Sequence, residues 1–185
     1  DVVSTVMSTP TSSWIGGGSG QWNDSANWSD GRVPGPEDDV HIEVPNVDAE
    51  ITISGQPVQV RGLYSFERIT INGQSLTITG ESRLFNEVSL RSNAVLLAKG
   101  AEADVSLLST VPSGGNYRAE QSGTLRLPLL TTMLAGSFNV QSGGVIEAPA
   151  LKRLMNVQVN IATSASLSVG QIEEFTLGTL TIAGG

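Results

Sequence analysis

The sequence contains no cysteine, which excludes a disulfide framework and a thiolate metal site. Lysine occurs only at Lys99 and Lys152, and the net charge is −8. A surface of this kind lacks the clustered cations that nucleic acid or an anionic membrane requires. The sequence also has no apolar run approaching the roughly 20 residues of a membrane span. We therefore expect no nucleic-acid partner and no membrane insertion.

Aromatic residues make up only 5% of the chain, whereas glycine is abundant at 21 residues. Many turns and few large side chains are typical of an all-β repeat protein. The hydrophobic fraction of 39% is close to that of an ordinary folded domain. The composition therefore favours a folded β protein over a helical or disordered one.

Near the C-terminal end the chain repeats at intervals of 21 residues, with segments starting at Tyr117, Phe138, Val159 and Leu180. Aligned segments share apolar residues two positions apart, as expected for strands whose alternate side chains face inward. The main columns are Tyr117/Phe138/Val159/Leu180, Ala119/Val140/Ile161/Ile182, Leu125/Ile146/Leu167 and Leu127/Ala148/Val169. Gly- and Ser-rich stretches between the paired columns indicate turns.

Each repeat is too short to bury its own apolar face, so neighbouring repeats must stack. We predict a right-handed parallel β-helix, a solenoid of six or seven coils of about 21 residues. An earlier coil is expected to start near Leu97, which places Lys99 in an inward column and requires a bulge or register shift there. A leucine-rich-repeat-like or receptor-L-type solenoid is the alternative, because Leu130-x-x-Met133 and Leu151-x-x-Leu154 have the corresponding spacing.

The N-terminal region differs from the repeats. We divide the chain into a Ser/Thr-rich lead-in (1–13), a Gly/Trp-rich N-terminal cap (14–50) and the solenoid coils (51–185). The segment 14–42 reads W-x-GGGSG-x-W-x4-NW-x2-G-x-VP-x4-D-V-x-I. It resembles the opening of many bacterial secreted β-helix proteins, including autotransporter-like adhesin passengers, and its second half resembles G8-type extracellular β modules. This resemblance implies an extracellular solenoid and carries no catalytic residue.

Two binding hypotheses concern the cap. Trp14, Trp22 and Trp28 form a candidate sugar platform, because aromatic faces stack on sugar rings. In the alternative interpretation they cover the edge and the apolar end of the first coil. Carboxylates in the same region offer oxygen ligands for one Ca²⁺ ion, the only cofactor that we consider. Its candidate ligands are Asp24, Asp38 and Asp39.

Candidate catalytic groups are sparse. His41 is the only histidine, and it is expected to face away from its neighbours in a strand, so no Ser-His-Asp triad or histidine metal cluster is predicted. The alignment stacks no two carboxylates in one column, and it places Arg126 and Glu147 side by side as an exposed ion pair. We therefore expect no enzymatic activity, with a polysaccharide lyase or hydrolase as the alternative.

A regular core with a polar exterior and no catalytic constellation predicts a structural or adhesive module of a bacterial surface, fibre or matrix protein. The expected location is extracellular or at the cell surface. The sequence stops at the start of a coil, so we expect either a longer native chain or subunits that stack end to end, making the chain its own partner. A carbohydrate-binding module is the alternative, with polysaccharide as the partner and the face carrying Asn139 and Asn160 as a second candidate surface.

Overall fold

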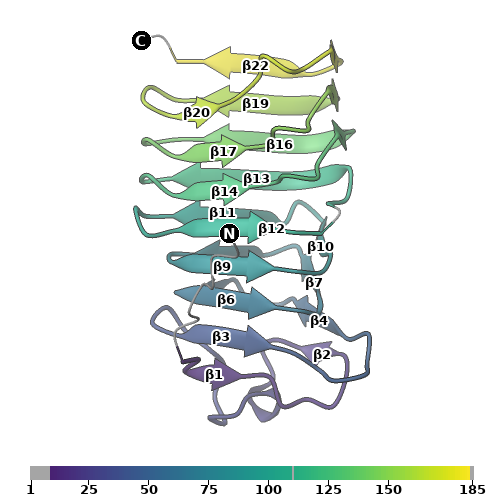
Figure 1. Ribbon diagram of the computed structural model, residues 1–185, viewed down its shortest axis with the longest axis vertical. Coiled ribbons are helices and arrows are strands. Elements are labelled where there is room, and N and C mark those ends of the chain that lie inside the picture. The colour runs from purple at the N-terminus through teal and green to yellow at the C-terminus, as the bar shows by residue number, and fades with distance from the viewer. Residues whose placement is uncertain (1–8, 110, 184–185) are drawn as a thin grey trace, which may run out of the picture.

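The chain folds into an all-β solenoid, seen in Figure 1 as a stack of coils along the long axis. The structure is a computed structural model that describes residues 9–109 and 111–183. Within these residues the only helical element is a single 3-10 turn, η1 (Ser25–Asn27). Every ladder between strands is parallel.

Four sheets form the walls of the solenoid. The front sheet contains β1 (Ser12–Ser13), β3 (Asp39–Ile42), β6 (Gly62–Ser65), β9 (Glu81–Leu84), β12 (Asp104–Leu107), β14 (Thr124–Arg126), β17 (Val145–Glu147) and β20 (Ser166–Leu167). The rear sheet contains β5 (Val58–Val60), β8 (Ser75–Ile78), β11 (Val95–Lys99), β13 (Gly114–Glu120), β16 (Ala135–Val140), β19 (Val157–Ile161) and β22 (Thr179–Ile182). The lower side sheet contains β2 (Gly20–Gln21), β4 (Glu50–Ile53), β7 (Arg68–Asn72) and β10 (Val88–Arg91). The upper side sheet contains β15 (Thr132–Met133), β18 (Arg153–Met155) and β21 (Glu174–Thr176).

The chain winds in the same sense along the whole stack. In Figure 1 the front strands point to the right, the rear strands point to the left, and the chain climbs from the N-terminal cap. This path is right-handed, the usual hand for crossovers between parallel strands. The right-handed parallel β-helix expected from the repeat is therefore confirmed, and the seven strands of the rear sheet mark seven coils.

The backbone register reproduces the columns of the sequence repeat. Tyr117 pairs with Phe138, Phe138 with Val159, and Val159 with Leu180, each 21 residues apart. Tyr117, Phe138 and Val159 are buried, and the rings of the first two stack with centroids 5.8 Å apart. Burying a large apolar side chain of this kind contributes about 1.5–3 kcal/mol. The columns of like residues thus become the core.

The coil before Tyr117 corrects one expectation. Leu96, and not Leu97, pairs with Tyr117, so the interval of 21 residues extends one coil further toward the N-terminus. Ala98 then lies buried beside Ala119, whereas Lys99 points outward and lies 3.7 Å from Glu120. The bulge or register shift expected at Lys99 is therefore wrong. The alternation of strand side chains accommodates the lysine without a distortion.

The leucine-rich-repeat-like alternative is not the observed fold. Front, rear and side sheets enclose the core together, and the core is not covered by one sheet and a row of helices. The spacing that suggested leucine-rich repeats comes from the corner that leads into the upper side sheet. Leu130 and Met133, like Leu151 and Leu154 one coil later, are buried at this corner.

Candidate functional site

The three tryptophans lie inside the cap rather than on its surface. All three side chains are buried, and Trp28 packs edge-on against Trp14 and Trp22 with ring centroids 5.1 and 4.8 Å apart. The indole N–H of Trp28 donates to the carbonyl of Trp22 at 2.7 Å. A Cβ at Gly16 would lie 2.8 Å from the ring of Trp14, so glycine is required for this packing. The arrangement offers no exposed indole face on which a sugar could stack, and it corresponds to the alternative interpretation of an end cap.

The three candidate calcium ligands have separate partners. Asp24 caps η1 by accepting a hydrogen bond from the amide of Ala26 at 3.0 Å. Asp38 accepts two hydrogen bonds from Arg32, while Asp39 pairs with Arg61 at 2.6 Å. Residues 9–109 and 111–183 contain no group of three or more His, Cys, Asp or Glu side chains placed to share a metal ion. The geometry therefore does not bring these carboxylates together as a calcium site.

Domain boundaries in the N-terminal region are less sharp than the sequence suggested. Ser12 and Ser13, assigned to the lead-in, already form β1 and pair with β3. Residues 1–8 of the lead-in lie outside the described residues. The described end of the lead-in is therefore part of the cap, because β3 lies within residues 14–50.

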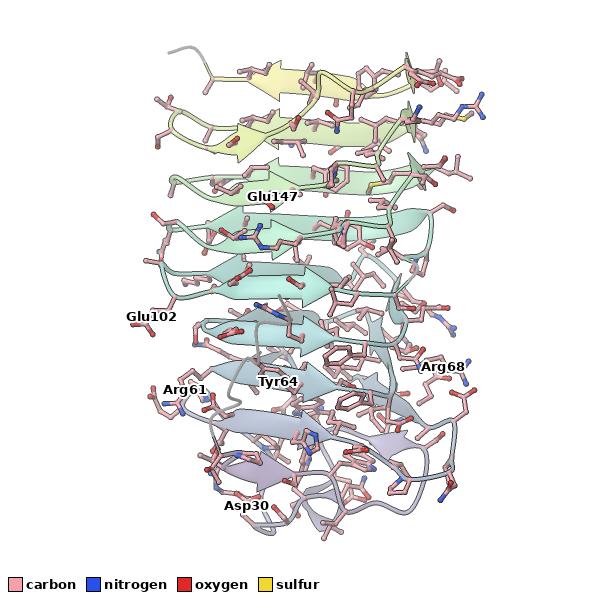
Figure 2. The ribbon with its side chains drawn as sticks, in the orientation of Figure 1. Asp30, Arg61, Tyr64, Arg68, Glu102 and Glu147 are labelled. Atoms are coloured by element: carbon pink, nitrogen blue, oxygen red, sulfur yellow. The ribbon has the colours of Figure 1, made fainter. Side chains whose placement is uncertain are left out.

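The outer face of the front sheet carries a ladder of charges. Glu81 and Asp104 are register partners on β9 and β12, so the expectation that no column stacks two carboxylates is wrong. The alignment missed this pair because Glu81 and Asp104 lie in coils whose length departs from 21 residues. Arg83 lies 3.0 Å from Glu81 and 3.5 Å from Asp104. Figure 2 shows this face toward the viewer, between the labelled Tyr64 and Glu147.

The same ladder continues upward through Arg126. Its Nε donates to Asp104 at 2.9 Å, and its guanidinium also binds Glu147, which confirms the predicted Arg126–Glu147 ion pair. These hydrogen bonds raise the pKa of Arg126, the bond to Asp104 having the largest effect. Two adjacent carboxylates are the minimum of a glycosidase site, but each of these carboxylates has an arginine partner on the outer face of a sheet. The geometry is that of an ion-pair ladder that links neighbouring coils.

His41 lies on the same outer face, as predicted, beside its register partner Tyr64. Its Nε2 is 3.8 Å from the carboxylate of Glu43, and its ring lies edge-on to Phe66 with centroids 6.1 Å apart. Phe66 in turn stacks on Phe85, with centroids 4.6 Å apart and ring planes within 5°. Sequence reasoning missed this exposed aromatic pair because the two phenylalanines fall outside the aligned columns.

A polar groove lies where the side of the solenoid turns into the rear sheet. We call it the corner groove; its cavity volume is about 370 Å³. Its strand residues follow one another in register on β13, β16, β19 and β22: Asn116, Ser137, Gln158 and Thr179. Asn156 and Leu177 form its rim at two successive corners. This volume lies within the range of small-ligand sites.

Two glycines form part of the lining of the corner groove. Gly136 and Gly178 line it and contribute no side chain. A Cβ at Gly136 would lie 1.9 Å from the carbonyl oxygen of Gly115, and one at Gly178 would lie 2.4 Å from that of Val157. At these two positions the backbone lies too close to the preceding coil for a side chain, whereas Val157 occupies the same column in the coil between them. The polar row of the groove is visible in the repeat alignment, as the polar position that precedes each Tyr117-type residue.

Asn139 and Asn160, the second candidate surface, are register partners on the same rear sheet, one column away from the corner groove. They line a smaller hollow of about 160 Å³ together with Gln141 and Thr181. The structure thus places this expected polar face beside the corner groove, on the same side of the solenoid.

Comparison of the chain with protein-family models, with curated proteins and with solved structures found no match. The resemblance of segment 14–42 to secreted β-helix proteins therefore remains an expectation. Among residues 9–109 and 111–183, no helix is long and apolar enough to cross a membrane.

Proposed function

We propose that this chain is a non-catalytic structural and adhesive module of an extracellular surface, fibre or matrix protein. The observation that carries the proposal is the distribution of polar groups over the coils. Charged side chains of the front sheet bind one another from coil to coil, as Arg83 and Arg126 do, whereas the upper coils of the rear sheet, from β16 to β22, carry rows of uncharged polar side chains. A rigid scaffold with one repetitive polar face suits binding to an extended surface.

Two further observations support an extracellular role. The segment 14–42 resembles the start of secreted β-helix proteins, and the chain is acidic with a net charge of −8. A polysaccharide lyase or hydrolase is the competing function, and the pair Glu81 and Asp104 is the place where its carboxylates would have to lie.

The proposed function can be tested with beads that carry the purified chain. We would measure bead retention on immobilised neutral polysaccharides, acidic polysaccharides and fibrous matrix proteins, and assay the same polymers for cleavage with added calcium. We expect retention on at least one surface and no new reducing ends or unsaturated sugars. Cleavage of any polymer would refute the non-catalytic role, and a lack of retention on every surface would refute adhesion.

A further inference from the structure

We propose that the corner groove binds a segment of an uncharged polysaccharide. This inference rests on the adhesive function proposed above and names the chemical class of its ligand. Three features of the groove support it: the uncharged polar residues of its lining, the strand register that aligns them, and an exposed leucine at its rim.

The lining of the corner groove suits a neutral ligand. The described residues that line it include amides and hydroxyls, and none of them carries an ionisable side chain. Amide side chains both donate and accept hydrogen bonds, and hydroxyl groups do the same. A sugar hydroxyl needs this dual capacity, whereas a phosphate or carboxylate would need a cation. The overall charge of −8 further disfavours a polyanion.

Several of these groups are not used by the protein itself. The side chains of Asn156, Gln158 and Thr179 make no hydrogen bond within the described part of the chain. By contrast, Asn116 donates to the carbonyl of Ala94 at 3.1 Å and accepts from the hydroxyl of Ser137 at 2.9 Å. The lower end of the groove is therefore fixed by internal hydrogen bonds, and the upper end presents free donors and acceptors to a ligand.

The register of the strands indicates an elongated ligand. Asn116, Ser137, Gln158 and Thr179 occupy equivalent positions on four successive coils. Coils in a parallel stack repeat every 4.8 Å or so, which gives the row a length of roughly 14 Å. Polar groups repeated along a line match a polymer whose hydroxyls also repeat along its axis. A single small molecule would not use the whole row.

Leu177 supplies an apolar contact at the rim. It is 85% exposed and held at a φ of 54°, a left-handed conformation that a bulky side chain rarely adopts. The equivalent corner one coil earlier carries Asn156 at a φ of 51°, a residue that tolerates this conformation well. An exposed leucine at a strained position beside a polar groove is explained by contact with the C–H face of a sugar ring.

Affinity electrophoresis tests the proposal with the intact chain. Native gels would contain a neutral glucan, xylan or mannan, and a parallel gel would contain polygalacturonate as the anionic polymer. We expect at least one neutral polymer to retard the wild-type chain and polygalacturonate to have no effect. A wild-type chain that no neutral polymer retards, or that only polygalacturonate retards, would overturn the proposal.

One double variant of the groove and one control locate the binding. Gln158→Ala combined with Thr179→Ala should weaken retardation about tenfold, since two hydrogen-bonding groups are lost. Gln59→Ala is the matched control: Gln59 is an exposed strand glutamine of the same sheet that lies outside the corner groove. The Gln59→Ala variant should be retarded as much as the wild-type chain. A double variant that circular dichroism shows to be folded and that still binds like the wild type would refute the site.

A third variant separates binding from stability. Leu177→Asn should raise the melting temperature, because asparagine fits the left-handed backbone, and should weaken retardation severalfold, because the apolar contact is lost. A purely structural leucine would not change retardation. If beads adhere only to acidic polymers or proteins, the groove proposal fails while the adhesive function stands. If they adhere to nothing, both fail.

Discussion

Arg32 and Asp38 form a two-point ion pair, with Nη1–Oδ2 and Nη2–Oδ1 distances of 2.7 Å each. The Asp38 carboxylate also accepts hydrogen bonds from the Thr11 hydroxyl at 2.8 Å and the Gly35 amide at 2.7 Å. Its side chain is 7% exposed. The hydrogen bonds from Arg32 are the main reason why the pKa of Asp38 lies well below its usual range. This one carboxylate therefore ties Thr11, next to β1, to the loop 32–38 of the cap.

We predict that acid loosens the cap before it unfolds the coils. Because the pKa of Asp38 is lowered in the folded state, its stabilising effect is present above the unfolded-state value near 3.9, and it is lost as the pH falls from there toward the lower folded-state value. All three tryptophans are in the cap, so their emission reports on the cap alone. Their emission should shift to the red at a higher pH than that at which the far-ultraviolet β-sheet signal is lost.

The variant Asp38→Asn serves as the control for the acid transition. It should lower cap stability at neutral pH by about 2 kcal/mol, the scale of lost hydrogen bonds to a charged group. It should also remove most of the pH dependence of tryptophan emission. Identical acid titrations of variant and wild type would contradict the assigned role of Asp38.

Glu67 is expected to be important for the stability of the lower coils. Its buried carboxylate accepts hydrogen bonds from the amides of Val44 at 2.9 Å and Ala49 at 3.1 Å, and so holds the connection between β3 and β4. Glu67→Ala leaves two buried amides unpaired and should reduce the free energy of unfolding by about 3 kcal/mol. Urea unfolding measures this loss. Glu102→Ala, at an exposed position that projects into solvent in Figure 2, should change it by less than about 0.5 kcal/mol.

Gly136 should not tolerate any side chain. It has a φ of 110°, and a Cβ there would overlap the carbonyl oxygen of Gly115. We expect Gly136→Ala to destabilise the chain by about 3 kcal/mol or more, measured by urea unfolding. Gly17→Ala, where nothing lies within 4 Å of the added Cβ, is the matched control and should be close to neutral. Equal stability of the two variants would refute the close approach of successive corners.

Removal of Arg83 should produce a salt-dependent loss of stability. Its Nη1 donates to the carbonyls of Ser82 and Asp104 at 2.9 Å each, and its charge separates the Glu81 and Asp104 carboxylates. Arg83→Met should cost about 1–2 kcal/mol at low ionic strength, and less near 1 M salt, where repulsion between the carboxylates is screened.

The exposed ion pair between Lys152 and Glu173, with an Nζ–Oε1 distance of 2.6 Å, is the control for the Arg83 ion pairs. Lys152→Met should change stability by less than about 0.5 kcal/mol at any salt concentration, because both side chains are largely in solvent. A salt-independent effect of Arg83→Met would indicate that the lost backbone hydrogen bonds, and not the charges, dominate.

The fold was predictable where coils have equal length. Tyr117, Phe138 and Val159 align because each coil adds the same number of residues, and the alignment alone then reveals the core columns. Upstream, Val58 pairs with Leu76 and Leu76 with Leu96, which are intervals of 18 and 20 residues. Unequal intervals move residues between columns, so the pairing of Glu81 with Asp104 could not be found by alignment at a fixed period.

The candidate sites were harder to predict than the fold. A tryptophan cluster has the same sequence signature whether its rings are exposed to a sugar or packed around each other, as Trp14, Trp22 and Trp28 are. The corner groove depends on how successive coils are placed at Gly136 and its neighbours, and the sequence does not distinguish a groove from an ordinary turn. Its polar residues share one column of the repeat, but the sequence does not show that this column lines a groove.

The equal coils from Tyr117 onward have a consequence for how such a chain can evolve. Each coil contacts mainly the one before and the one after it, so a 21-residue segment can be duplicated or deleted without disturbing the cap. Every added copy would extend the row that contains Gln158 by one more polar side chain. The length of ligand that the protein can contact is therefore set by the number of coils, and it can grow by duplication without any new kind of contact.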